Sequence, residues 1–236
     1  MRPHMARRCP RIMAESALLW EVTMGLIDLT GPITEGMWTF GPPLPEVRLT
    51  KLARLEHEGW DANLIHMGNI QGTCLETAAH LFPNQPSIDQ VPLDRFFCRA
   101  AVLQLPDKQA RELITVADLR GAGVEIAPGM AVLVATGWDR MWADPRFYWD
   151  SPHFTLEAME WIAAKQPGIL GVDIPSDDDP YEPVGVNKVI FGTGALLMGP
   201  LVNVRRIRSK YVDLVALPLP IVGLCGTPCR AVAIEP

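Results

Sequence analysis

Prolines interrupt this chain at short intervals and limit the length of any regular element. The 236 residues include 22 prolines, each of which fixes φ and lacks the backbone N–H that helices and central strands need. Three of them fall within residues 41–45, a stretch that therefore cannot be helical. We expect short helices and strands joined by rigid turns.

Length and composition predict one large hydrophobic core. With 48% hydrophobic and 20% charged residues, the chain can bury most of its unfolded surface, which excludes global disorder. The apolar stretch 212–224 is interrupted by Asp213 and by prolines, so we expect no membrane-spanning segment. A formal net charge of -6 disfavours nucleic acid as a partner.

The cysteines and the N-terminus indicate a cytoplasmic protein. Five cysteines are an odd and sparse set for a disulfide framework, so we interpret them as reduced thiols. The first 22 residues are rich in arginine and lack a secretory signal pattern. We expect a flexible extension over residues 1–22 and one domain over residues 23–236.

Hydrophobic patterns predict an α/β domain in which strands outnumber helices. One helix is expected over residues 115–120, and another begins at Thr155 and ends before Pro167. Residues 47–55 alternate apolar with polar residues, which predicts a half-buried strand. The other expected strands cover residues 27–30, 63–67, 72–76, 100–105, 131–135, 169–172, 212–219 and 231–234. These elements predict a single domain with a large mixed sheet.

The segment Asn69–His80 holds a thiol, a carboxylate and an imidazole within seven residues. In a strand, Cys74 and Glu76 point to the same face. A turn after the strand would bring the ring of His80 back over the same pocket. The alternative is structural: a small cysteine that fills the core and a hydrogen-bonded histidine. We interpret the segment as a candidate active site.

This segment resembles the signature of the cyclase family, which contains bacterial kynurenine formamidase, isatin hydrolase and polyketide cyclase-like proteins. The family motif reads His-x-Gly-Thr-His-x-Asp-x-Pro-x-His, and Gly72, Thr73 and His80 match it. Four further blocks resemble the family in order and spacing: residues 27–32, 128–138, 171–176 and 223–234. The resemblance implies a swivelling β/β/α fold, a homodimer or homotetramer, and His80 as the acid/base.

The departures from this motif fall on the metal-binding positions that the resemblance implies. Ile70 stands at the first histidine, Cys74 at the second and Glu76 at the aspartate. Downstream, Asn187 and Gly199 take the places of a histidine and a glutamate that assist in some members. Isoleucine and glycine side chains offer no ligand, whereas catalytic zinc takes three good protein ligands. We therefore predict no metal cofactor.

Without a metal, proton transfer or nucleophilic attack remains. His80 is the predicted acid/base, Glu76 its partner, and Cys74 either lines the substrate or attacks it. Such a site suits cyclisation, dehydration, isomerisation or opening of an apolar, ring-bearing small molecule. The candidate substrate-binding residues are Trp38, Phe40, Trp60, Phe82, Trp138 and Asn187.

Two other functions stay open. In the first, Cys74, Glu76 and His80 hold zinc or manganese in a hydrolase of amides, formamides or lactones. In the second, the protein binds a small molecule without catalysis. Two further motifs have plainer interpretations: the acidic run 177–179 as a solvated turn, and Cys225 and Cys229 as buried thiols beside a turn.

Overall fold

The computed structural model describes residues 25–236, so the predicted N-terminal extension lies outside the described residues. The strands are β1 (Gly25–Asp28), β2 (Arg48–Ala53), β3 (Ala62–His66), β4 (Cys74–Glu76), β5 (Phe97–Gln104), β6 (Leu113–Ile114), β7 (Ala131–Ala135), β8 (His153–Phe154), β9 (Ile169–Val172), β10 (Leu196–Gly199), β11 (Tyr211–Pro218) and β12 (Gly226–Glu235). The helices are α1 (Leu55–Glu58), α2 (Val116–Gly121), α3 (Leu156–Ala163) and α4 (Val186–Phe191).

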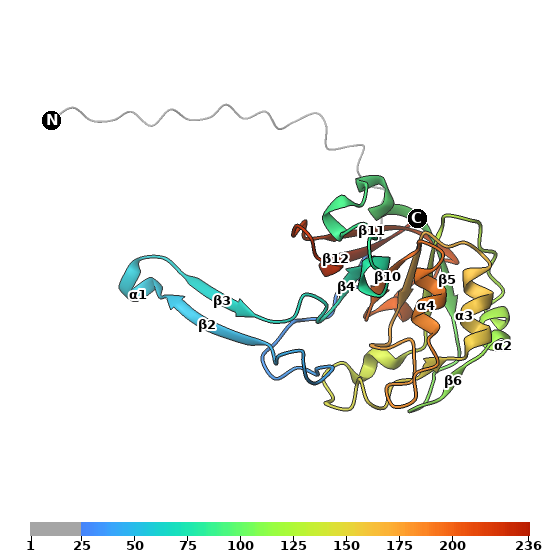
Figure 1. The fold of residues 1–236 in the computed structure, drawn as a ribbon, viewed down its shortest axis with the longest axis horizontal. Helices are drawn as coiled ribbons and strands as arrows, with labels where there is room; N and C mark the ends of the chain where they lie inside the picture. The colour runs from blue at the N-terminus through green and yellow to red at the C-terminus, as the bar shows by residue number, and fades with distance from the viewer. Residues whose placement is uncertain (1–24) are drawn as a thin grey trace.

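One mixed sheet forms the centre of the molecule (Figure 1). Its strand order is β1-β12-β11-β5-β7-β9-β10-β4, and β4 also pairs with β12, which closes the sheet into a barrel-like core. Strands β5, β7, β9 and β10 run parallel to one another, whereas β4, β11 and β12 pair antiparallel with their neighbours. The predicted single α/β domain with a large mixed sheet is confirmed.

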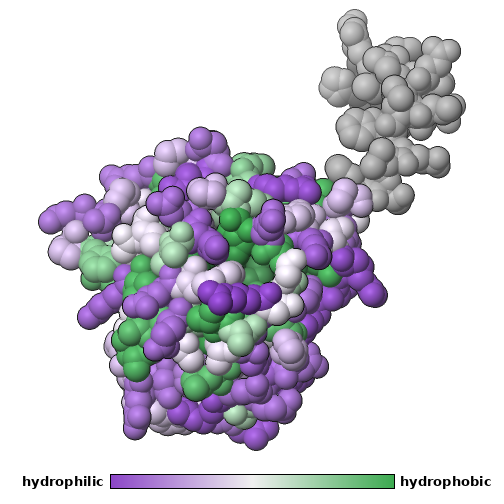
Figure 2. Space-filling view, turned by 90° about the vertical axis from the view of Figure 1, so that its right-hand side faces the viewer, coloured by the Kyte–Doolittle hydropathy of each residue, from purple (hydrophilic) through white to green (hydrophobic). Residues whose placement is uncertain are grey.

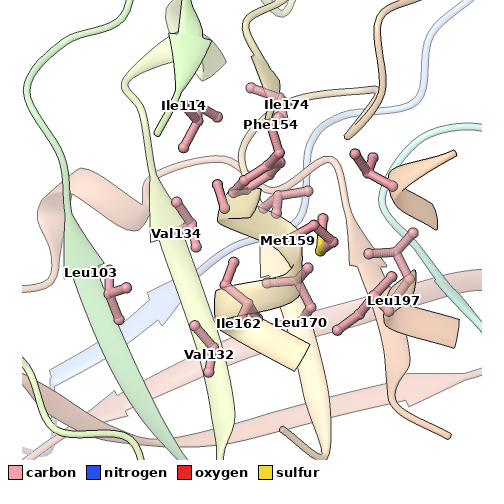
Figure 3. Packing of buried hydrophobic residues seen from close by; sticks show 14 of the residues in the cluster. Leu103, Ile114, Val132, Val134, Phe154, Met159, Ile162, Leu170, Ile174 and Leu197 are labelled. Atoms are coloured by element: carbon pink, nitrogen blue, oxygen red, sulfur yellow. The ribbon is translucent and has the colours of Figure 1, made fainter. Parts of the chain in front are cut away.

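Helices α2, α3 and α4 lie together on one side of this sheet (Figure 1). Met159 and Ile162 of α3 pack against Val132 and Leu170 of the strands, in a cluster closed to solvent (Figure 3). The hydroxyl of Thr155 caps α3 by accepting the backbone N–H of Ala158 at 3.1 Å, as predicted. On the face shown in Figure 2, hydrophilic side chains cover most of the surface.

Strands β2 and β3 form an antiparallel hairpin that extends away from the body (Figure 1). We call residues 48–66 the arm. The sequence predicts half-buried strands here, but the structure differs: Ala53 is buried, whereas the leucines of both strands are exposed. The strands pair with each other rather than with the main sheet, so their alternating pattern has no core to face.

The buried side chain of Gln71 joins the two ends of the arm. Its amide nitrogen donates to the carbonyl of Pro45 at 2.6 Å, before the arm. Its amide oxygen accepts the backbone N–H of Gly68, after the arm. We call this pair of hydrogen bonds the Gln71 clamp.

Helix α4 and strand β10 are absent from the sequence-based prediction. The N-terminus of α4 is capped from a distance: the carboxylate of Asp178 accepts the backbone N–H groups of Val184, Gly185 and Val186 at 2.8, 2.7 and 3.1 Å. The expectation of a solvated acidic turn is therefore wrong for Asp178, and it is also wrong for Asp177, because both are buried. Among the described helices, none is long and apolar enough to cross a membrane.

Candidate active site

Strand β4 and the turn that follows it bring the predicted catalytic residues together. Thr77 caps a 3₁₀ turn over Ala78–His80, where its hydroxyl accepts the N–H of Ala79 at 3.2 Å. This turn places the Nδ1 atom of His80 3.3 Å from Oε2 of Glu76. The Sγ atom of Cys74 lies 3.6 Å from Oε1 of the same carboxyl group. The juxtaposition of the three side chains agrees with the prediction from their spacing.

Glu76 and His80 border a cavity of about 270 Å³. Glu76 and His80 form one wall, and the rings of Phe40, Tyr148 and Phe191 contribute much of the rest. The Phe40 and Tyr148 rings meet edge to face with centroids 5.0 Å apart. The remaining lining residues are Leu44, Ile70, Pro175, Ser176, Asp177, Asn187 and Leu197. A cavity of this size and character can enclose a small ring-bearing molecule.

A smaller cavity of about 30 Å³ adjoins the first and shares Phe40, Glu76 and Asp177 with it. Cys74 and Gly199 also line it. Its volume matches a single water-sized oxygen group. The site therefore combines a main cavity with a small, mostly apolar recess that two carboxyl groups and one thiol also line.

Burial controls the protonation of the acidic groups in this site. It raises the pKa of the Cys74 thiol well above its ordinary value, and the negative charge of Glu76 adds to that effect. The Cys74 thiol donates a hydrogen bond to the Gly199 carbonyl at 3.2 Å. A buried thiol that stays protonated is a poor nucleophile. This geometry favours Cys74 as a wall of the recess rather than as the attacking group.

The Glu76 carboxyl is subject to two opposing influences. Burial, the larger, raises its pKa, while the nearby His80 ring and the Cys74 hydrogen bond lower it. A carboxyl that contacts an imidazole fixes the orientation of the ring and stabilises its protonated form. Glu76 is thus placed to fix the orientation of the His80 ring.

Cys225 lies unexpectedly close to the predicted acid/base. Its Sγ atom is 3.7 Å from Nδ1 of His80, and the Asn69 side-chain amide lies 3.7 Å from the same sulfur. Cys225 is partly exposed, so the expectation of a buried thiol is wrong for this residue, whereas Cys229 is buried as expected. Nδ1 of His80 therefore faces both a carboxyl group and a thiol.

Four of the six predicted substrate-binding residues lie away from the main cavity, which differs from the expectation. Trp38 packs against Trp142 and Phe147, and Trp138 donates its indole N–H to the Phe147 carbonyl at 2.8 Å, so both belong to the core. Phe82 packs against the same core. Trp60 is 59% exposed beside the arm strand β3. Phe40 and Asn187 do border the cavity.

The positions that the resemblance assigns to metal ligands do converge on this site, but their side chains do not fit a catalytic metal. Ile70 and Asn187 line the main cavity, and Cys74 and Gly199 line the recess. Across residues 25–236, no three or more His, Cys, Asp or Glu side chains are grouped so that they could hold a metal ion. Catalytic zinc takes three protein ligands and an open position. The donor set falls short of that requirement.

Residues that sequence reasoning missed come from distant segments. The sequence predicts a solvated turn at Asp177 and gives no indication of a site role for Tyr148 or Phe191. One signal was available for Asp177: it follows the buried strand β9, and polar groups at the carboxyl ends of parallel strands commonly line ligand sites. Tyr148 reaches the cavity from an irregular segment that carries no such signal.

The fold and the site together define an α/β protein with a paired carboxyl group and imidazole at the wall of a cavity. The sequence matches the family described as "Putative cyclase" over residues 27–179, and the chain belongs to this cyclase family.

An isatin hydrolase from Roseibium aggregatum is 23% identical over 89% of this chain and 92% of that protein. The structure of isatin hydrolase A from Ralstonia solanacearum is similar with a TM-score of 0.80 and 22% identity, over 90% of this chain and 92% of that one. A predicted metal-dependent hydrolase from Bacillus stearothermophilus is similar with a TM-score of 0.75 and 22% identity, over 90% of this chain and 99% of that one.

Proposed function

We propose that this cyclase-family enzyme carries out metal-independent acid/base chemistry on an apolar, ring-bearing small molecule. The observation that carries the proposal is the His80–Glu76 pair, 3.3 Å apart, at the wall of a cavity lined by aromatic rings. Cyclisation, dehydration, isomerisation and ring opening all require a proton to move at a bound ring. A secondary metabolite is the kind of substrate we propose.

Each side chain has a stated role in this proposal. His80 takes a proton from the substrate or from water, and Glu76 orients the imidazole and stabilises the cation that forms. The rings of Phe40, Tyr148 and Phe191 hold the substrate and exclude water. Cys74 shapes the recess behind the proton-transfer pair.

A second candidate function is metal-dependent hydrolysis of an amide, formamide or lactone. The names of the relatives favour it, since they include an isatin hydrolase and a metal-dependent hydrolase. In this alternative, zinc or manganese would be held by Cys74, Glu76 and His80. That arrangement would occupy His80 and leave the site without its free base.

Metal content separates the two candidates before any substrate is known. We expect far less than one zinc or manganese per chain when the protein is purified without an affinity metal or a chelator and analysed by elemental mass spectrometry. One equivalent per chain would instead favour the hydrolase.

The catalytic proposal is tested with His80→Ala. Isatin, the compound in the relatives' names, is the first probe, followed by other cyclic carbonyl compounds. We expect the variant to lose turnover while its melting temperature stays within a few degrees of the parent protein. The matched control is His66→Ala, on the exposed arm, which should retain activity. Full activity in His80→Ala would overturn the proposal, and ligand binding without turnover in the parent protein would indicate a binding protein.

The proposal includes a cytoplasmic homodimer or homotetramer that acts on a small molecule. Light scattering on the purified full-length chain measures the oligomeric state directly. A monomer at micromolar concentration would remove this part of the proposal and leave the chemistry unaffected.

A further inference from the structure

Asp177 is a buried acidic side chain that the roles described above do not use. It follows β9 and lies in the loop that leads to α4. The residue is 3% exposed, and its Oδ1 atom has no hydrogen-bond partner among the described residues. It lines both the main cavity and the recess. A polar atom that is buried without a partner at a cavity wall is available to a ligand.

The neighbouring Asp178 shows what a structural carboxylate looks like in this loop. Its oxygens accept three backbone N–H groups at the start of α4 and a fourth from Asp179 at 3.0 Å. Asp178 is therefore fully engaged as a helix cap. Asp177 lacks such donors, and an ionised carboxylate without donors is costly to bury. The surroundings of Asp178 thus stabilise a carboxylate, whereas those of Asp177 favour the neutral acid.

Charged and titratable groups meet Asp177 from each side of the site. Glu76 and Cys74 of β4 line the recess with it, Asp178 is its neighbour in the loop, and His80 shares the main cavity. Burial, followed by the negative charges of Glu76 and Asp178, raises the pKa of Asp177 from 3.8 to about 7. At neutral pH and below, the neutral acid is substantially populated.

We propose that Asp177 is a second catalytic residue, a carboxylic acid that donates its proton to the carbonyl oxygen of a cyclic ketone, lactam or lactone bound in the main cavity. This inference rests on the proposed function and narrows its substrate class. The carbonyl oxygen enters the recess on its Asp177 side, and a recess of about 30 Å³ has room for one oxygen atom. The ring stays among the aromatic side chains.

In this role, Asp177 would stabilise negative charge on the carbonyl oxygen, which the residues at the substituted metal positions cannot do through a metal. Reactions at a carbonyl place negative charge on oxygen in the transition state, and a metal or a hydrogen-bond donor must stabilise that charge. A carboxylic acid kept neutral by its surroundings is such a donor. Asp177 and His80 then act on opposite ends of the reacting group.

Water is the only further reagent that the proposed steps need. When water attacks the carbonyl carbon, a new C–O bond forms and His80 accepts a proton from the water. The electron pair of the C=O π bond moves to oxygen, which takes the proton of Asp177 to give a tetrahedral intermediate. When this intermediate breaks down, its hydroxyl proton returns to Asp177, the ring bond to the leaving atom breaks, and the His80 imidazolium protonates the leaving atom. In an isomerisation, His80 instead takes a C–H proton and returns it to another carbon, while the oxygen is protonated and deprotonated by Asp177.

Infrared spectroscopy tests the protonation of Asp177 without a substrate. At pH 6 we expect a C=O band of a protonated carboxylic acid that Asp177→Asn lacks and that Asp144→Asn retains. Asp144 is the matched control because its hydrogen bonds from Arg146 hold its pKa down to about 2. The band should fade as the pH rises to 9. Identical pH 6 spectra for Asp177→Asn and the parent protein would overturn the inference.

Kinetics on isatin, oxindole and phthalide test the catalytic role. We expect Asp177→Asn to lose about 100-fold or more in kcat, with a smaller change in KM, because the amide can still donate a hydrogen bond but cannot transfer a proton. Asp144→Asn should match the parent protein. Full activity of Asp177→Asn together with an inactive His80→Ala would overturn the inference and leave the proposed function standing. If the parent protein neither binds nor converts any of the three probes, the cyclic carbonyl class is wrong.

Discussion

Replacing Asp177 with asparagine should change how stability depends on pH. The free energy of unfolding of the variant, minus that of the parent protein, should increase as the pH rises. The folded pKa of about 7 lies above the ordinary value of 3.8, so between these values the unfolded chain ionises while the folded chain holds its proton. The free energy of unfolding then falls as pH rises, until the folded group also ionises near pH 7. Asparagine does not titrate, so the variant lacks this contribution to the pH dependence of stability.

The magnitude follows from the same two values. At 1.36 kcal/mol per pKa unit, the full difference corresponds to about 4 kcal/mol, of which the interval from pH 5 to pH 8 covers about 3 kcal/mol. We therefore expect the stability of Asp177→Asn minus that of the parent protein to increase by up to about 3 kcal/mol across this interval. Asp173, whose pKa burial raises to about 6, contributes to both proteins and cancels in the difference.

Urea denaturation followed by circular dichroism at pH 5, 6, 7 and 8 measures this difference directly. The control is Asp144→Asn, since the Asp144 carboxylate stays ionised throughout the interval. A change below about 0.5 kcal/mol for Asp177→Asn, the size expected of an ordinary surface substitution, would refute the reasoning. Asp177 would then be ionised in the folded protein and unable to serve as an acid.

Two further predictions concern the thiols and the helix cap. With iodoacetamide at pH 7.5, the partly exposed Cys98 and Cys225 should be labelled faster than the buried Cys74 and Cys229. Burial raises the pKa of all four thiols, but the reagent reaches only the exposed pair, and the rise is largest for Cys74 and for Cys229, whose pKa is about 12. Peptide mass spectrometry identifies the labelled sites, and rapid labelling of Cys74 would contradict its position in the recess. Thr155→Ala should lower the free energy of unfolding by about 1 kcal/mol in urea denaturation, while Thr155→Ser keeps the cap; equal losses in both variants would show that the hydroxyl is not the source.

Local sequence patterns predict those parts of the fold whose causes are local. The cap and apolar face of α3 lie within one short segment, and the continuous apolar run of β7 needs no partner to be recognised. Helix α4 was missed because it spans six residues, begins after Gly185 in a left-handed conformation, and has its cap at Asp178. Nothing within the helix marks its start.

The same distinction holds for the candidate site. Glu76 and His80 are four residues apart, so their contact follows from a strand and one turn. Tyr148, Asp177 and Phe191 meet them through the closure of the sheet and the packing of α4. Trp38 and Trp138 show the opposite error, since a large aromatic residue near a motif fills the core as readily as it lines a cavity.

The Gln71 clamp holds the base of the arm together beside the cavity. Two residues that line the cavity lie next to the members of the clamp: Leu44 precedes Pro45, and Ile70 lies between Gly68 and Gln71. We therefore expect bending of the two-stranded ribbon beyond the clamp to have little effect on the spacing of these walls. A change in the length or sequence of the arm should then leave unaltered which molecules the cavity admits.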